Sequence, residues 1–115
     1  MPAWDTLPEG ITLGQEETIL RTARFGKRKL MFWITNRRLI IGKQGKKRTT
    51  VALTLPLDHV AVVAVGRKKG FLHHDVRLIV DSTGGRALLE ELHGNEAAAA
   101  SEFCGFVSNV LSGPR

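Results

Sequence analysis

Apolar and polar residues follow the two-residue period of a β-strand along most of the chain. Runs rich in β-branched and aromatic residues are separated by short polar or glycine-containing segments, a pattern typical of antiparallel hairpins. The stretches predicted to be strands are residues 16–25, 30–35, 38–42, 50–55, 58–65, 75–81 and 86–92. Residues 1–15 are expected to be irregular because they contain Pro2, Pro8, Gly10 and Gly14.

Two of these stretches alternate strictly, and the alternation predicts which side chains share a face. In 50–55 one face is expected to carry Val51, Leu53 and Leu55. In 75–81 one face is expected to carry Val76, Leu78 and Val80. Pro56 should end the fourth strand because proline has no N–H to donate to a neighbouring strand.

Near the C-terminus the period changes to that of a helix. Apolar residues three and four positions apart form one stripe, made of Phe103, Phe106, Val107, Val110 and Leu111. The opposite side carries Ser101, Gly105, Ser108 and Ser112. Asn95 is a predicted N-cap, and Gly113 followed by Pro114 is a predicted stop. The pattern therefore predicts an amphipathic helix over residues 96–111 that buries its apolar stripe against the strands.

The order of these elements, and three motifs within them, resemble the GRAM and bacterial PH-like families. The motifs are E-E-T-I-L before a basic turn, M-F-W-I-T-N-R-R-L-I-I-G, and L-T-L-P-L-D-H-V. The matching residues are Thr35, Asn36, Arg38, Leu39, Ile40, Leu55, Pro56, Leu57 and Val60. The resemblance implies a single domain over residues 1–115: a mainly β, PH-like, partly open barrel of about seven antiparallel strands, closed by one C-terminal α-helix.

The T-N-R-R turn at residues 35–38 has a structural reading and a functional one. Asn36 is expected to take the left-handed backbone of a tight turn. Arg38 is expected to lie across the open end of the barrel, with its guanidinium bonded to carbonyls or a carboxylate; direct contact with a ligand is the alternative. Arg37 is expected to be exposed.

Positive charge is concentrated in the middle of the chain. The formal net charge is +6, from 17 Lys and Arg against 11 Asp and Glu. Of the 17 basic residues, 12 lie between Lys27 and Lys69, where Asp58 is the one acid. A one-sided positive field would favour phosphate-bearing partners, whereas ordinary solvated loops are the alternative explanation.

The basic residues expected to contact an anionic headgroup lie in three predicted loops and the T-N-R-R turn. They are Lys27, Arg28, Lys29, Arg37, Lys46, Lys47, Arg48, Arg67, Lys68 and Lys69. In lipid-binding PH domains the first strand–strand loop usually holds the phosphoinositide, and the resemblance places 26–29 there. Each Lys or Arg near an anionic leaflet contributes about 1 kcal/mol, so several loops must act together.

The expected function is therefore a non-enzymatic binding module that docks on anionic, phosphoinositide-like membrane surfaces. One alternative is a protein-interaction or self-assembly scaffold, including a homo-oligomer, without lipid binding. Weak nucleic-acid binding is a second alternative, disfavoured because the chain has no tyrosine and its Phe32 and Trp33 lie in a predicted core run. The expected location is the cytoplasm, at the membrane periphery where lipid is bound.

No residue pattern indicates catalysis, a cofactor or a metal. The sequence lacks a P-loop, a G-x-S-x-G motif and a catalytic paired-carboxylate motif. The histidines are scattered or adjacent along a strand, a poor arrangement for chelation. Cys104 has no basic partner nearby in sequence and is expected to be a packed, unreactive thiol.

Overall fold

The structure is a computed structural model, and it describes residues 7–45, 47–69 and 74–113. For 67–69 and 74–75 it describes the backbone alone. The strands are β1 Ile19–Phe25, β2 Leu30–Thr35, β3 Arg38–Gln44, β4 Thr49–Pro56, β5 Val60–Lys69, β6 His74–Ser82 and β7 Gly85–Leu92. The helix α1 spans Ala97–Ser112, and short 3-10 turns span Leu57–His59 and Gly94–Glu96.

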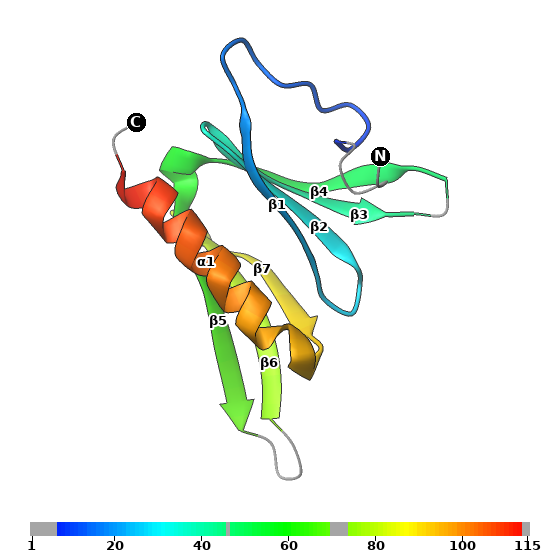
Figure 1. Ribbon diagram of the computed structural model, residues 1–115, viewed down its shortest axis with the longest axis vertical. Coiled ribbons are helices and arrows are strands. Elements are labelled where there is room, and N and C mark those ends of the chain that lie inside the picture. The colour runs from blue at the N-terminus through cyan, green and yellow to red at the C-terminus, as the bar shows by residue number, and fades with distance from the viewer. Residues whose placement is uncertain (1–6, 46, 70–73, 114–115) are drawn as a thin grey trace.

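The strands form two antiparallel sheets. One has the order β1-β2-β3-β4 and the other β5-β6-β7. Figure 1 shows α1 crossing the three-stranded sheet beside β1. The chain is thus mainly β with one C-terminal helix, and its two sheets do not close on each other, as in a partly open PH-like barrel.

The main core lies between the two sheets and α1. The rings of Phe25, Phe32 and Phe103 meet there with centroids 5.8 Å apart in each pair. Phe103 and Val107 are fully enclosed, whereas Phe106 and Val110 are partly buried against the same core. The polar side of the helix is exposed, as the sequence predicts. The apolar stripe therefore docks on the strands with its centre deeper than its margins.

The start of α1 differs from the prediction. Asn95 is not the N-cap, because it lies inside the 3-10 turn Gly94–Glu96 that precedes the helix. The Glu96 carboxylate accepts hydrogen bonds from the His93 N–H at 2.8 Å and from the Gly26 N–H at 3.2 Å. The second bond ties the helix start to the end of β1, a long-range contact that a local capping pattern does not encode.

The two central strands of the first sheet, β2 and β3, are buried on both faces. On the face opposite the main core, Met31, Trp33 and Ile40 form a second cluster that includes Leu7 and Ile11 from the irregular N-terminal segment. Figure 1 shows this segment, in dark blue, passing over the four-stranded sheet. This explains why residues 30–34 are apolar at every position.

A bulge in β4 makes one predicted face wrong. Ile41 pairs with Leu53 and Gly42 with Val51, which leaves Ala52 as an extra residue. Leu53 and Leu55 pack on the main core, but Val51 turns away and is 40% exposed. An extra residue in one strand reverses the face of every residue beyond it, so strict alternation in the sequence could not reveal the change.

The predicted loop that contains Arg67, Lys68 and Lys69, expected over residues 66–70, is also wrong for the residues that the structure describes. β5 continues to Lys69, and Arg67, Lys68 and Lys69 pair with Val76, Asp75 and His74 of β6. β7 ends at Leu92, opposite Val76, so β5 and β6 extend beyond it as a two-stranded ribbon. Pairing needs only backbone groups, so a run of charged residues can continue a strand. Gly70 lies outside the described residues.

Phe103 and Phe106 of α1 are buried to different depths, so replacing each by alanine should lower the stability by different amounts. Phe103→Ala should lower the free energy of unfolding by roughly 3–5 kcal/mol, as truncations of enclosed aromatic residues do. Phe106→Ala should cost about 1–2 kcal/mol, because that ring is only partly buried against the core. Urea unfolding of the two variants measures the difference, and equal costs would contradict the packing of α1.

Candidate functional site

Two basic segments meet at one end of the first sheet. β2 begins at Leu30, which pairs with Phe25 at the end of β1 and with Lys43 near the end of β3. The β1–β2 turn and the β3–β4 loop therefore lie at the same end. The β2–β3 turn with Arg37 lies at the opposite end, because β2 runs the full length between them.

Two glutamates of β7 bind residues of the β1–β2 turn. The Arg28 Nε lies 2.7 Å from Glu90 Oε1, and the Arg28 N–H donates to Glu90 Oε2 at 3.2 Å. The Glu90 side chain is only 3% exposed. Lys27 Nζ lies 3.4 Å from Glu91 Oε2 in an exposed pair. Arg28 is thus the counter-ion of a buried carboxylate, a structural role that the sequence analysis did not assign to it.

Gly26 allows the turn to approach β7 so closely. Its φ of +97° lies in the left-handed region, and a Cβ there would overlap the Glu90 carboxylate. The Lys27 N–H also donates to the Glu91 carbonyl at 3.0 Å. The β1–β2 turn therefore joins the two sheets and is fixed by its contacts with β7.

Three lysines at this end are exposed and lie in no ion pair with another described residue: Lys29, Lys43 and Lys47. We call them the basic end. Arg48 lies beside them and pairs with Glu9 at 3.4 Å, but 70% and 63% of the two side chains are exposed. Exposed pairs of this kind exchange easily for another anion, because each contributes about 0–1 kcal/mol.

The other predicted ligand residues are not brought to this end by the described structure. Arg37 is exposed, as expected, but at the far end of the sheet. Arg67, Lys68 and Lys69 lie in the β5–β6 ribbon, and their side chains and Lys46 lie outside the described residues. Lys43 was not among the predicted ligand residues, although it lies at this end, in β3 beside Leu30.

Arg38 has the structural role that the sequence favours. Its Nε and Nη2 donate to the two carboxylate oxygens of Glu17 at 2.9 and 3.1 Å, and Nη2 also donates to the Thr12 carbonyl at 2.8 Å. Only 24% of the Arg38 side chain and 3% of the Glu17 side chain are exposed. Glu17 also accepts from Thr35 Oγ1 at 2.7 Å and from the Gly14 N–H at 2.8 Å.

Asn36 stabilises the β2–β3 turn through its side chain and not through the left-handed backbone that the sequence predicted. It has no left-handed backbone; the described non-glycine residues with positive φ are Glu16 and Lys29. Its side chain instead accepts from the Thr18 N–H at 2.9 Å and donates to the Glu16 carbonyl at 3.0 Å. Asn36 therefore ties the β2–β3 turn to the chain entering β1.

Hydrogen bonds lower the pKa of the Glu17 carboxyl by more than burial raises it. Burial by itself would raise the pKa of this carboxyl, but the bonds from Arg38, the Gly14 N–H and Thr35 lower it to about 2 from the ordinary 4.5. Glu17 is therefore ionised in the folded protein at every pH at which the fold is ordinarily studied.

Cys104 is buried, and burial raises the pKa of its thiol to about 11, as expected for a packed side chain. Over residues 7–45, 47–69 and 74–113, no three His, Cys, Asp or Glu side chains are grouped so as to hold a metal ion. No described helix is both long and apolar enough to cross a membrane.

Comparisons with protein-family models, with curated proteins and with solved structures give no match.

The Glu17 network predicts a specific pH dependence of stability. Because folding lowers the Glu17 pKa from 4.5 to about 2, the stabilisation is complete above pH 4.5 and is lost as the pH falls towards 2. Glu17→Gln should lower the free energy of unfolding at pH 7 by up to about 3 kcal/mol. The difference from the unsubstituted protein should shrink below pH 4.5. Glu16→Gln, next in the chain but exposed, is the control; a constant Glu17→Gln deficit down to pH 2 would contradict the network.

Burial predicts that Cys104 reacts slowly. Under native conditions at pH 8 its labelling by a thiol reagent should be slower than in denaturant by orders of magnitude, because the thiolate is scarce and enclosed. Ser101→Cys in a Cys104→Ala background places a thiol on the exposed side of the same helix and should label rapidly. Comparable native rates for the two thiols would show that α1 does not cover Cys104.

Proposed function

We propose that the chain is a non-enzymatic binding module of the PH/GRAM type that docks on anionic membrane surfaces through the basic end. The observation that carries this proposal is the position of Lys29, Lys43 and Lys47. Two separate chain segments bring these exposed lysines to the same end of one sheet, and no described acid pairs with them. Phosphate-bearing lipid headgroups are the natural counter-ions of such a surface.

The binding free energy expected from these lysines fits weak, reversible docking. At about 1 kcal/mol for each cation, the three lysines contribute about 3 kcal/mol towards an anionic leaflet. Arg48 can add to this when a headgroup replaces Glu9. Because these charges are exposed, salt should screen them over a Debye length of about 8 Å at physiological ionic strength.

The buried aromatic residues disfavour single-stranded nucleic acid as the ligand. Single-stranded nucleic acid is commonly bound by stacking bases on exposed aromatic side chains. Phe32 and Trp33 are 1% and 0% exposed, so neither ring can serve as a stacking platform. The remaining positive surface suits an array of phosphates without base recognition.

Vesicle sedimentation tests the proposal. The unsubstituted protein should bind vesicles of mixed phosphatidylcholine and phosphatidylinositol phosphate at low salt, and release them at high salt. Lys29→Glu, Lys43→Glu and Lys47→Glu together should weaken binding at least about tenfold, because three attractive charges become repulsive. The melting temperature should change little, since these exposed side chains form no ion pair with another described residue.

A charge-matched control separates docking from net charge. Arg37→Glu makes the same change in charge as Lys47→Glu, but at the opposite end of the sheet. Lys47→Glu should weaken vesicle binding several-fold more than Arg37→Glu. Equal effects would mean that the whole molecule binds by its net charge, and no binding by the unsubstituted protein would refute lipid docking.

A further inference from the structure

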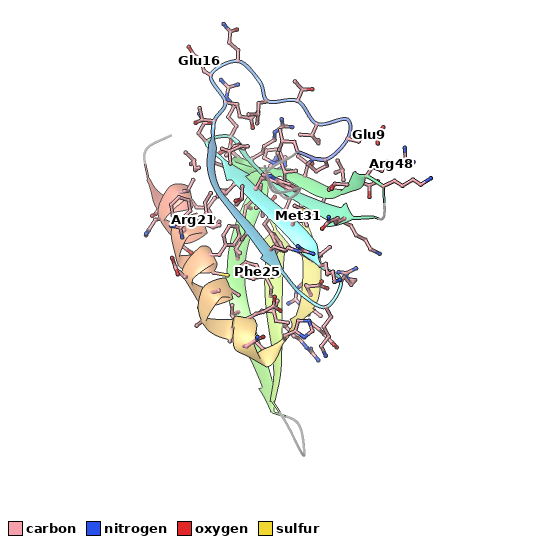
Figure 2. All side chains as sticks on the ribbon, turned by 45° about the vertical axis from the view of Figure 1, so that its right-hand side comes forward. Glu9, Glu16, Arg21, Phe25, Met31 and Arg48 are labelled. Carbon is pink, nitrogen blue, oxygen red and sulfur yellow. The ribbon has the colours of Figure 1, made fainter. Side chains whose placement is uncertain are left out.

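A groove separates β1 from α1. Its cavity of about 290 Å³ is lined by residues 21–25 of β1 and by Ala99, Glu102 and Phe103 of α1. Figure 2 labels Arg21 and Phe25, which lie on β1 beside the helix. At the Phe25 end the groove is closed, because the Phe25 and Phe103 rings are 5.8 Å apart and Glu96 binds the Gly26 N–H. Towards Arg21 the strand and the helix are joined by side chains at the surface.

One wall of this groove is a free strand edge. β1 is the last strand of its sheet, and no backbone hydrogen bond joins its residues to any described segment other than β2. Backbone groups of successive strand residues point alternately to the two sides, so every second residue of β1 presents an unpaired N–H and C=O towards the groove. Such an edge can pair with an additional strand, and proteins usually cover or blunt it.

The charges beside this edge favour an acidic ligand. β1 contributes Arg21 and Arg24, against the single acid Glu102 from α1. Arg24 is exposed and forms no ion pair with another described residue. Arg21 Nη1 lies 3.2 Å from Glu102, with the guanidinium 4.3 Å above the Phe106 ring. The Arg21–Glu102 pair is exposed, so a ligand carboxylate can replace Glu102 at little cost.

The register of β1 fixes how the acidic groups must be spaced. Arg24 pairs with Met31, on the face covered by the N-terminal segment, whereas Ala23 pairs with Phe32 on the core face. Arg21 is two residues from Ala23 and therefore shares its face. A strand added beside β1 would place one side chain opposite each β1 residue. Its residues opposite Arg21 and Arg24 would be three positions apart and on opposite faces.

We propose that this groove binds an acidic protein segment in extended conformation, which adds to β1 as a further strand. The segment carries two acidic residues three positions apart, one for Arg21 and one for Arg24. Between them, an apolar residue opposite Ala23 enters the cavity beside Phe25 and Phe103. Main-chain hydrogen bonds to β1 would provide affinity, and the contacts with the two arginines and with the cavity would provide specificity. This site is separate from the basic end and does not depend on lipid docking.

Selection from random peptides tests the proposal directly. A phage-displayed library of linear octapeptides is selected on the immobilised protein, and enriched peptides are synthesised and measured by fluorescence anisotropy. We expect enrichment of acid–apolar–x–acid or acid–x–apolar–acid sequences, for the two possible strand directions. Binding should slow amide hydrogen exchange in β1. No enrichment of acids three positions apart would overturn the proposal.

Substitutions on the two sides of the groove have opposite expected effects. Arg24→Glu should weaken a selected peptide about tenfold or more, because a charge-assisted contact becomes repulsive. Glu102→Gln should strengthen binding several-fold, because it releases Arg21 and removes a competing carboxylate. Arg37→Glu and the triple lysine variant of the basic end should bind the peptide within about twofold of the unsubstituted protein. Weakening by Glu102→Gln, or an equal loss in Arg37→Glu, would refute the groove as the site.

Discussion

The arrangement of the first sheet depends on two buried carboxylates, one near each of its ends. Glu17 and Glu90 each have only 3% of the side chain exposed, and each is bound by an arginine, Arg38 and Arg28. An ionised carboxylate removed from water requires a counter-ion and hydrogen bonds. Arg38 thereby holds the segment before β1 against β3, and Arg28 holds the β1–β2 turn against β7. These pairs connect the first sheet to its N-terminal cover and to the second sheet.

This structural use of arginine changes the kind of binding that the surface supports. Arginine suits fixed, bidentate contacts with phosphate or carboxylate, whereas lysine is a compact and strongly hydrated point charge on a flexible stem. With Arg28 and Arg38 bound to buried acids, the unpaired charges at the basic end are all lysines. Such a surface favours diffuse attraction to many headgroups over recognition of one headgroup in a rigid pocket.

Local patterns in the sequence predicted the strands, the helix and the role of Arg38, because periodicity and turn residues are local properties. The errors have non-local causes. The bulge that exposes Val51 depends on pairing with β3, and the extension of β5 to Lys69 depends on pairing with β6. Glu90 is one of two adjacent acids in β7, and only the approach of the β1–β2 turn makes it a partner for Arg28. Counting basic residues along the sequence therefore overstates how many cations are available to a ligand, because buried glutamates bind Arg28 and Arg38.

The basic end and the groove share β1, and this connection constrains how they could act together. β1 ends at the turn that carries Lys29, and its seven residues extend about 23 Å away from that turn. A protein docked on a membrane by the basic end would hold the groove along an axis leading away from the bilayer. An acidic segment is repelled by an anionic leaflet, so it would enter the groove most easily from the Arg21 end, which is farther from the turn. In that orientation the Phe25–Phe103 contact, which closes one end of the groove, would lie at the end nearer the membrane, where no entry is needed.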